Sequence, residues 1–141
     1  IDEGLVGSEM CIRDRNNTMQ NVINFIQANM NFLNDIQAYH WQTKSYSEHE
    51  SLQEFYEKFY ELNDRFVETW QGKTHQRVNF SAELRPGIMN YADNRQVCSE
   101  VCKTSDRINE IYKEVDGPDL KSILEDMLEA TSQLCYHLTL K

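Results

Sequence analysis

The 141-residue sequence contains few residues that interrupt helices, only five Gly and two Pro. This scarcity argues against many short strands joined by tight turns and favours long helices. No apolar run approaches the roughly 20 residues of a membrane span, so we expect no membrane segment. A signal-peptide pattern is also missing, and four Cys without a regular framework suit a reducing compartment. We therefore expect a cytoplasmic protein.

Positive charge is scarce as well. The chain has 14 Lys and Arg against 23 Asp and Glu, a formal net charge of −9. An acidic surface repels phosphate, so we expect no nucleic-acid partner. The sequence also lacks a Gly-x-Ser-x-Gly elbow, a P-loop and a dinucleotide fingerprint, so nothing in it supports a general hydrolase.

Residues 1–15 differ from the remainder of the chain. They show no amphipathic period and do not begin with Met, and the run from Ser8 to Asp14 resembles a translated sequencing-library adapter. The segment is either a non-native assembly product or an ordinary N-terminal tail. In both cases we expect it to be disordered, with the domain occupying residues 16–141 and a native start near Met19.

A helical period is present in four segments, residues 19–42, 48–71, 94–115 and 119–140. Their inward stripes are Val22, Phe25, Ile26, Asn29, Phe32, Leu33, Ile36 and His40; Leu52, Phe55, Tyr56, Phe59, Asn63, Phe66 and Trp70; Val97, Val101, Ile108, Tyr112 and Val115; and Leu120, Ile123, Leu124, Met127, Leu128, Thr131, Leu134, Cys135 and Leu138. The first and last links are short, and the link over residues 73–93 is long. This pattern predicts an all-α fold, a ferritin-like antiparallel four-helix bundle with one long crossover between the second and third helices.

Three residues indicate where these helices begin and end. Ser47, with Glu50 three residues later, fits a capping box at the start of the second helix. Gly72 is a natural stop for that helix. Pro118 suits the first position of the fourth helix.

Four side chains stand out as a possible metal site: His40, His49, Asp64 and Glu68. Imidazole with carboxylate suits iron, zinc or manganese. A lone His is more often a surface or core residue, and the two acids by themselves read as a solvated face beside Arg65. His49 and Asp64 lie 15 residues apart, about 22 Å along one helix at 1.5 Å per residue, and cannot share a metal within one chain. An antiparallel partner helix brings them together, which predicts a two-fold homodimer or a higher homo-oligomer.

These residues also carry a resemblance. His40-Trp41, then His49, then Asp64-x-x-x-Glu68 is similar to the intersubunit ferroxidase signature of the Dps mini-ferritins, with a spacing between the two His three residues shorter here. The resemblance implies a non-haem iron site of one or two ions that oxidises Fe(II) with peroxide or O₂. Trp41 is a possible redox neighbour in that comparison, although packing is the more frequent role of such a residue.

The sequence departs from this family in two places. Where mini-ferritins usually place an Asp one turn after the second His, this chain has Gln53, a weaker ligand. Glu61 is a possible accessory ligand, with a surface position as the alternative. The Lys-rich N-terminus of DNA-binding members is missing, because residues 19–43 contain neither Lys nor Arg.

A second resemblance covers more of the chain. Residues 42–49, 54–56 and 68–72 are similar to an uncharacterised family from tailed bacteriophages, which implies the host cytoplasm as the location. The alternative function is therefore a non-enzymatic phage helical-bundle protein with a degenerate metal site, acting as an accessory or interaction protein.

The cysteines of the third and fourth helices allow two interpretations. Cys98 and Cys102 share a helical face, and Cys135 lies on the neighbouring predicted helix. A thiolate metal site needs a further ligand such as His137. Buried small hydrophobes are the favoured interpretation.

Overall fold

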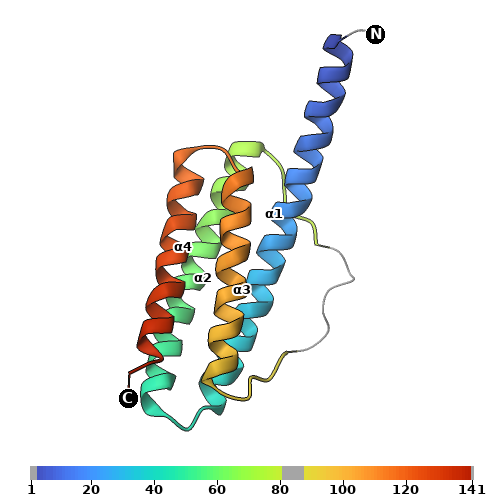
Figure 1. The fold of residues 1–141 in the computed structure, drawn as a ribbon. Helices are drawn as coiled ribbons and strands as arrows, with labels where there is room; N and C mark the ends of the chain where they lie inside the picture. The colour runs from blue at the N-terminus through green and yellow to red at the C-terminus, as the bar shows by residue number, and fades with distance from the viewer. Residues whose placement is uncertain (1–2, 81–87, 141) are drawn as a thin grey trace.

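The chain folds into four α-helices joined by two short turns and one long connection (Figure 1). The structure is a computed structural model that describes residues 3–80 and 88–140, with side chains described from Asn17 onward. The helices are α1 (Glu3–Gln42), α2 (Tyr46–Thr74), α3 (Asn94–Glu114) and α4 (Pro118–His137). The described residues form no strand, which confirms the all-α prediction.

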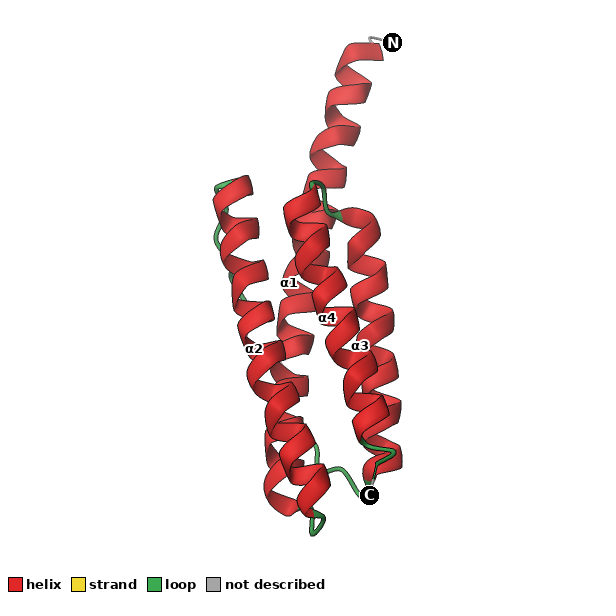
Figure 2. Ribbon diagram, turned by 90° about the vertical axis from the view of Figure 1, so that its left-hand side faces the viewer, coloured by secondary structure: helices red, strands yellow, loops and turns green. Residues whose placement is uncertain are grey.

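The helices pack as an antiparallel bundle in which each contacts two others. α1 lies against α2 and α3, and α4 lies against α2 and α3. α1 and α4 run in one direction and α2 and α3 in the other, as Figures 1 and 2 show. The connection from α2 to α3 therefore spans the length of the bundle, as predicted; residues 81–87 within it lie outside the described part.

The predicted stripes form the core. Most of their members are buried, while His40, Tyr56, Tyr112, Leu128 and Cys135 are half-buried. The interface of α1 and α2 is aromatic, with edge-to-face pairs such as Phe25 on Phe66, at 5.4 Å between ring centroids. The core positions of α3 and α4 are aliphatic. Burial of these stripes, worth about 25 cal/mol per Å² of apolar area, holds the helices together.

The start of α1 differs from the prediction. The helix begins at Glu3, sixteen residues before Met19, and its first turns project beyond the other three helices (Figure 1). A helix that is already packed can extend at one hydrogen bond per added residue, without a new nucleation cost. The expected disorder of residues 1–15 thus contrasts with helical backbone from Glu3 on. Their non-native origin stays a prediction. Residues 1 and 2 and the side chains of residues 3–16 lie outside the described part.

Two helix ends also differ from the prediction. The N-cap of α2 is Ser45 rather than Ser47, and its hydroxyl accepts a hydrogen bond from the Glu48 amide at 3.3 Å. α2 continues through Gly72 to Thr74 and is closed by His75 in the left-handed region, with φ 59°. A glycine in an exposed turn weakens a helix without ending it where the next turn still forms its hydrogen bonds.

The start of α4 agrees with the prediction. Pro118 occupies the first turn, where its missing N–H leaves no hydrogen bond unmade. The preceding Gly117 has φ 102°, a backbone conformation that residues with a Cβ atom rarely adopt.

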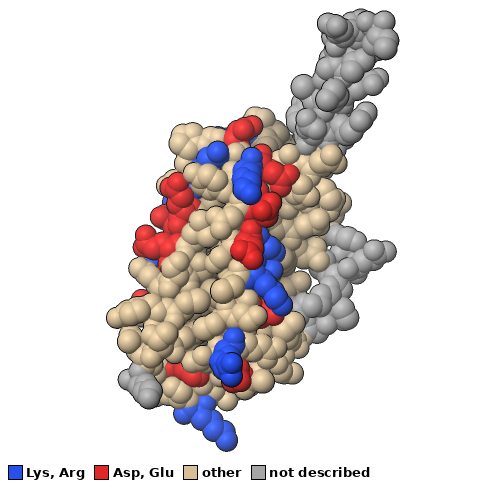
Figure 3. Space-filling view, in the orientation of Figure 1, with Lys and Arg blue, Asp and Glu red and all other residues tan. Residues whose placement is uncertain are grey.

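The surface over α3 and α4 is polar and of mixed charge. Acidic and basic side chains alternate along α3, and acidic side chains gather over α4 (Figure 3). Among the described residues, no helix combines the length and the apolar character needed to cross a membrane.

Candidate functional site

The turn between α1 and α2 brings two of the four predicted site residues together. His40 lies in the last turn of α1 and His49 in the first turn of α2, and both side chains are half-buried. Their rings are stacked, with centroids 3.8 Å apart and planes inclined by 18°. The prediction that these two residues meet at the turn is confirmed.

The two histidines hold each other by reciprocal hydrogen bonds. Nδ1 of His40 donates to the carbonyl oxygen of His49 at 2.9 Å, and Nδ1 of His49 donates to the carbonyl oxygen of His40 at 2.8 Å. A carbonyl oxygen can only accept, so both Nδ1 atoms carry the proton. In each neutral ring the lone pair then lies on Nε2, the atom through which imidazole binds metals.

Helix geometry explains why these carbonyl groups are available. α1 ends at Gln42, so the carbonyl of His40 is among the last four of the helix, which have no partner within it. The carbonyl of His49 lies inside α2 and uses its second lone pair. A backbone carbonyl that accepts from Nδ1–H is a common outer-shell arrangement of metal-bound histidines, because it fixes the tautomer and the ring orientation.

A second hydrogen-bond network braces the same turn. The Glu48 carboxylate accepts from the Tyr39 hydroxyl at 3.3 Å and from the Thr43 hydroxyl at 3.2 Å. Burial and the nearby charge of Glu48 raise the pKa of Tyr39, so this hydroxyl stays protonated and remains a donor. The sequence analysis missed this role of Glu48, although Ser45-x-x-Glu48 matches the capping pattern as well as the pair that it selected.

The two predicted acidic ligands lie far from the histidines. Asp64 and Glu68 are exposed on one face of α2, about 22 Å and 28 Å, respectively, along the helix axis from His49. Among the described residues neither carboxylate forms a hydrogen bond or an ion pair. No group of three or more His, Cys, Asp or Glu among the described residues can hold a metal ion. One chain therefore keeps the four predicted ligands in two separate pairs.

The weaker candidates are all at the surface. Gln53 is exposed, and its amide donates to the Glu57 carboxylate at 3.2 Å. Glu61 is exposed, in line with the surface alternative. Trp41 is 69% exposed, whereas Trp70 is buried in the core. An exposed tryptophan beside His40 is not core packing, which leaves an interface or a redox role for it.

Among the described residues, most buried polar groups of the bundle are neutral; the exception is Asp35 of α1, whose carboxylate accepts from the Met89 amide at 2.8 Å. Asn29 of α1 donates to Asn63 of α2 at 3.0 Å, and both residues are buried. Thr104 and Thr131 are the buried polar residues of α3 and α4. Metal sites inside helical bundles use carboxylates and histidines from facing helices. The described part of this interior has no such set, and the predicted ligands His40, His49, Asp64 and Glu68 all lie outside the core.

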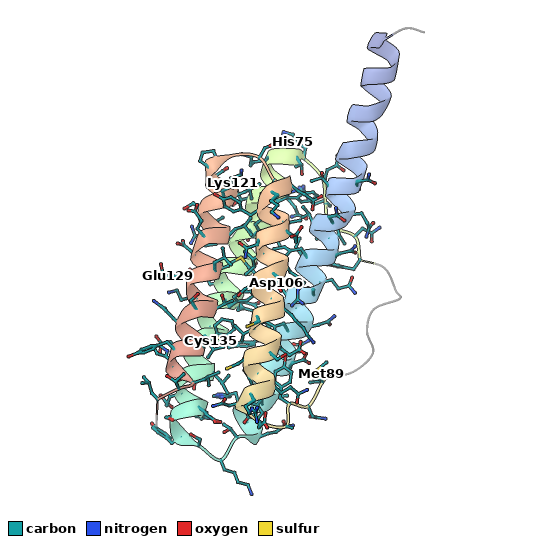
Figure 4. All side chains as sticks on the ribbon, viewed as in Figure 1. His75, Met89, Asp106, Lys121, Glu129 and Cys135 are labelled. Carbon is teal, nitrogen blue, oxygen red and sulfur yellow. The ribbon has the colours of Figure 1, made fainter. Side chains whose placement is uncertain are left out.

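Two of the three cysteines on α3 and α4 are half-buried. Cys98 and Cys135 are half-buried and interact with each other, and Figure 4 shows Cys135 on α4. Burial raises the pKa of both thiols, that of Cys135 to about 11. Metals bind the thiolate, so a raised pKa disfavours a thiolate site. The small-hydrophobe interpretation fits these two residues; Cys102 is exposed and does not share it.

The comparison with known proteins adds a family. The model of DUF5856, a family of unknown function, matches residues 40–138, which is 99 of the 141 residues. The chain belongs to this family. No curated protein and no solved structure matches the chain.

The matched range of DUF5856 begins at His40 and includes His49, Asp64 and Glu68, together with α2, α3 and α4. Most of α1 precedes it. The description of DUF5856 assigns no activity, ligand or source. The mini-ferritin and bacteriophage resemblances therefore stay predictions.

The exposed apolar side chains of α1 and α2 were not predicted from the sequence. Several large apolar side chains of α1 and α2 are exposed, with Met30 at 47%, Tyr46 at 78% and Tyr60 at 58%. Exposed large apolar side chains are candidates for contact with a partner, and Tyr60 lies on the same stripe of α2 as His49 and Tyr56. His49, Tyr56 and Tyr60 follow one another at steps of seven and four residues, which places them along one stripe of α2. This spacing is the signal that could have identified the stripe.

Proposed function

We propose that the chain is an iron-binding homodimer in which each metal site combines His40 and His49 of one chain with Asp64 and Glu68 of the other. The observation that carries the proposal is the reciprocal pair of hydrogen bonds, which occupies both Nδ1 atoms and leaves both Nε2 atoms available to a metal ion. The unpaired carboxylates further along α2 supply the complementary half.

The donor set fits a divalent first-row metal. Two neutral imidazoles and two carboxylates carry a net charge of −2, which balances one divalent ion. Iron accepts both ligand types and keeps positions open for an oxidant, whereas zinc or manganese are the competing occupants. Fe(II) is then the substrate, oxidised by peroxide or O₂. The two carboxylates stabilise the additional positive charge of Fe(III), since they lie in a partly desolvated interface.

The outer face of the α1–α2 pair supports the required dimer. An antiparallel pair of α2 helices places the two histidines of one chain at the level of the two acids of the other, so that both pairs of ligands can reach one metal ion. Trp41 and Tyr60 are exposed on the two helices and can be covered by the partner. A two-fold interface of this kind makes two equivalent sites.

A non-enzymatic role, as an accessory or interaction protein with a degenerate site, is the second candidate. Its specific support is Gln53, the residue one turn after His49, whose amide is engaged with Glu57. A neutral amide there removes one negative charge that a second iron ion needs. Binding without oxidation is the outcome that identifies this function.

The test is a complementation experiment with two variants. His40→Ala/His49→Ala removes the imidazoles, and Asp64→Asn/Glu68→Gln removes the charges. We expect each variant by itself to lose iron affinity by at least about 100-fold in an anaerobic Fe(II) titration. After the two are mixed under dissociating conditions and returned to buffer, random pairing restores about one quarter of the parental sites. No restoration by mixing overturns the intersubunit site.

Oxidation is measured separately on the iron-loaded parent. Absorbance of Fe(III) after addition of one equivalent of peroxide reports oxidation at the site. His137→Ala, which changes a half-buried His at the end of α4, is the matched control and is expected to bind and oxidise iron as the parent does. Tight Fe(II) binding without faster oxidation than in buffer favours the non-enzymatic function.

A further inference from the structure

We propose that Tyr56 and Tyr60 form the centre of the interface between two copies of this chain, where Tyr56 of each chain faces Tyr60 of the other. The inference rests on the proposed antiparallel pairing of α2 helices. It identifies the surface that sets the register of that pairing, and thereby brings each histidine pair to the level of the partner acids.

The position of the two-fold axis follows from the spacing along α2. Tyr56 follows His49 by seven residues, and Tyr60 precedes Asp64 by four and Glu68 by eight. If His49 lies opposite a level between Asp64 and Glu68 of the partner, Tyr56 lies opposite Tyr60 of the partner. The axis then passes at the level of residue 58, one residue from Glu57 and roughly 14 Å along the helix from His49 at 1.5 Å per residue.

The two tyrosines form a preorganised aromatic surface. Their rings are stacked within one chain, with centroids 6.0 Å apart and planes inclined by 19°. Tyr56 is half-buried and packs against the core, which fixes its ring, while Tyr60 is 58% exposed. Tyrosine is enriched at interface hot spots, because a rigid ring buries a large apolar area while its hydroxyl stays hydrated.

The same helical stripe continues on both sides of the tyrosines. His49, Tyr56, Tyr60 and Val67 follow one another at steps of seven, four and seven residues, the spacing of a seam between two helices. Val67 is half-buried and packs against the core beside this seam. A partner helix that covers the stripe therefore meets apolar side chains at its centre and the metal ligands towards its two ends.

Charge limits the stability of the pair without metal. Glu57 lies beside the axis and faces its own copy, and Glu61, Asp64 and Glu68 are exposed on the same side of α2. Like charges across an interface oppose association, and salt screens them within about 10 Å at 0.1 M. A divalent ion at each end of the seam removes part of this repulsion, so metal binding and dimer formation reinforce each other.

Alanine substitution of the exposed tyrosine tests the surface. We expect Tyr60→Ala to weaken dimerisation of the full chain by at least about 30-fold in sedimentation equilibrium, as for a central hot spot. The matched control is Tyr136→Ala, because Tyr136 is 62% exposed on α4 and lies outside the seam. Circular dichroism of both variants checks the fold. A dimer of parental strength in Tyr60→Ala overturns the proposal, as does equal weakening by the control.

Cross-linking tests the axis directly and does not depend on loss of binding. In a background with all four native Cys replaced by Ser, Glu57→Cys places two thiols beside the axis. Diamide, which accepts the two electrons and two protons of the thiols, is expected to give a disulfide-linked dimer. Glu129→Cys on α4 is the control and is expected to stay monomeric. No faster cross-linking of Glu57→Cys than of Glu129→Cys overturns the axis position.

The outcomes separate this inference from the proposed function. A tyrosine-dependent dimer that cross-links at position 57 and binds no Fe(II) supports the surface and contradicts the iron site. A dimer that binds Fe(II) at the complementation site and is unaffected by Tyr60→Ala supports the iron site and contradicts the surface.

Discussion

The two helical hairpins of the bundle differ in what their side chains do beyond packing. Each contains a tyrosine hydroxyl that donates to a carboxylate, Tyr39 to Glu48 in α1–α2 and Tyr112 to Glu125 in α3–α4. In the first hairpin this pair is partly buried and braces the turn that holds two stacked histidines. In the second it lies on the exposed surface. The same pair of residue types thus serves a candidate site in one hairpin and surface structure in the other.

The largest expected effect comes from the cores of the two hairpins. Phe59 of α2 and Leu124 of α4 are both fully buried. Phe59→Ala removes an aromatic ring packed on Phe32 and Phe55, and we expect a loss of about 3–5 kcal/mol; Leu124→Ala is expected to cost about 2–5 kcal/mol. Urea denaturation followed by circular dichroism measures both. Values below about 1 kcal/mol for either would contradict the core described here.

The matched tyrosine–carboxylate pairs give an intermediate effect that sharpens the comparison. Glu48→Gln removes the charge that braces the histidine turn, and we expect Fe(II) affinity to fall about 10-fold, as for a lost outer-shell partner. Glu125→Gln is the control and is expected to leave Fe(II) affinity unchanged. Equal iron affinity in the two variants would show that the network around Glu48 has no part in metal binding.

Glu48→Gln and Glu125→Gln can also be compared by the absorbance of the tyrosine that each carboxylate accepts from. Glu48 raises the pKa of Tyr39, in addition to burial, and the hydrogen bond from Tyr112 to Glu125 raises the pKa of Tyr112. Each substitution is therefore expected to lower the pKa of its own tyrosine, seen as earlier phenolate absorbance in an alkaline titration. A titration curve identical to that of the parent would show that the hydroxyl is not bonded to the substituted carboxylate.

The smallest effect concerns the thiols of α3 and α4. The pKa of Cys135 is raised from 9.0 to about 11 by burial, so folding favours its protonated form. Its contribution to stability is complete below pH 9 and is lost as the pH rises from 9 towards 11. Cys135→Ser is expected to flatten this part of the stability profile, measured by urea denaturation at several pH values. An unchanged slope between pH 9 and 11 would place the titrating group elsewhere.

Thiol labelling gives the same prediction in kinetic form. Cys102 is exposed, whereas Cys98 and Cys135 are half-buried and hydrogen-bonded. In a Cys11→Ser background, one thiol is expected to react rapidly with an aromatic disulfide reagent at pH 7.5 and two slowly. Three equally fast thiols would contradict the burial of Cys98 and Cys135.

Much of the fold was predictable because the helical period is regular. The stripes from Val22 to Leu138 contain most of the buried residues, and the long link between α2 and α3 indicated the crossover. Some core residues lie outside the predicted stripes, and Tyr91 is one of them. Tyr91 lies outside any period, in the connection, and becomes buried only because α1 and its neighbours create a surface for it. The shift of the α2 cap from Ser47 to Ser45 reflects competition between two serines of similar capping strength.

Less of the candidate site was predictable. The closeness of His40 and His49 followed from a short turn between two helices, since residues that flank such a turn are neighbours in space. The reciprocal hydrogen bonds could not be predicted, because they depend on the rotation of one helix about its axis relative to the other. The meeting of His49 with Asp64 and Glu68 stays a prediction, since it depends on a second chain.

The sequence by itself determined four helices, their inward faces and their order, because apolar periodicity is a local property that each segment carries alone. Tertiary structure decided which nitrogen of each histidine bears the proton, which tyrosine remains exposed on α2 and which carboxylate braces the turn. These features depend on the register and rotation of packed helices. Register is fixed by the sum of many side-chain contacts, each too weak to be identified from the residues alone.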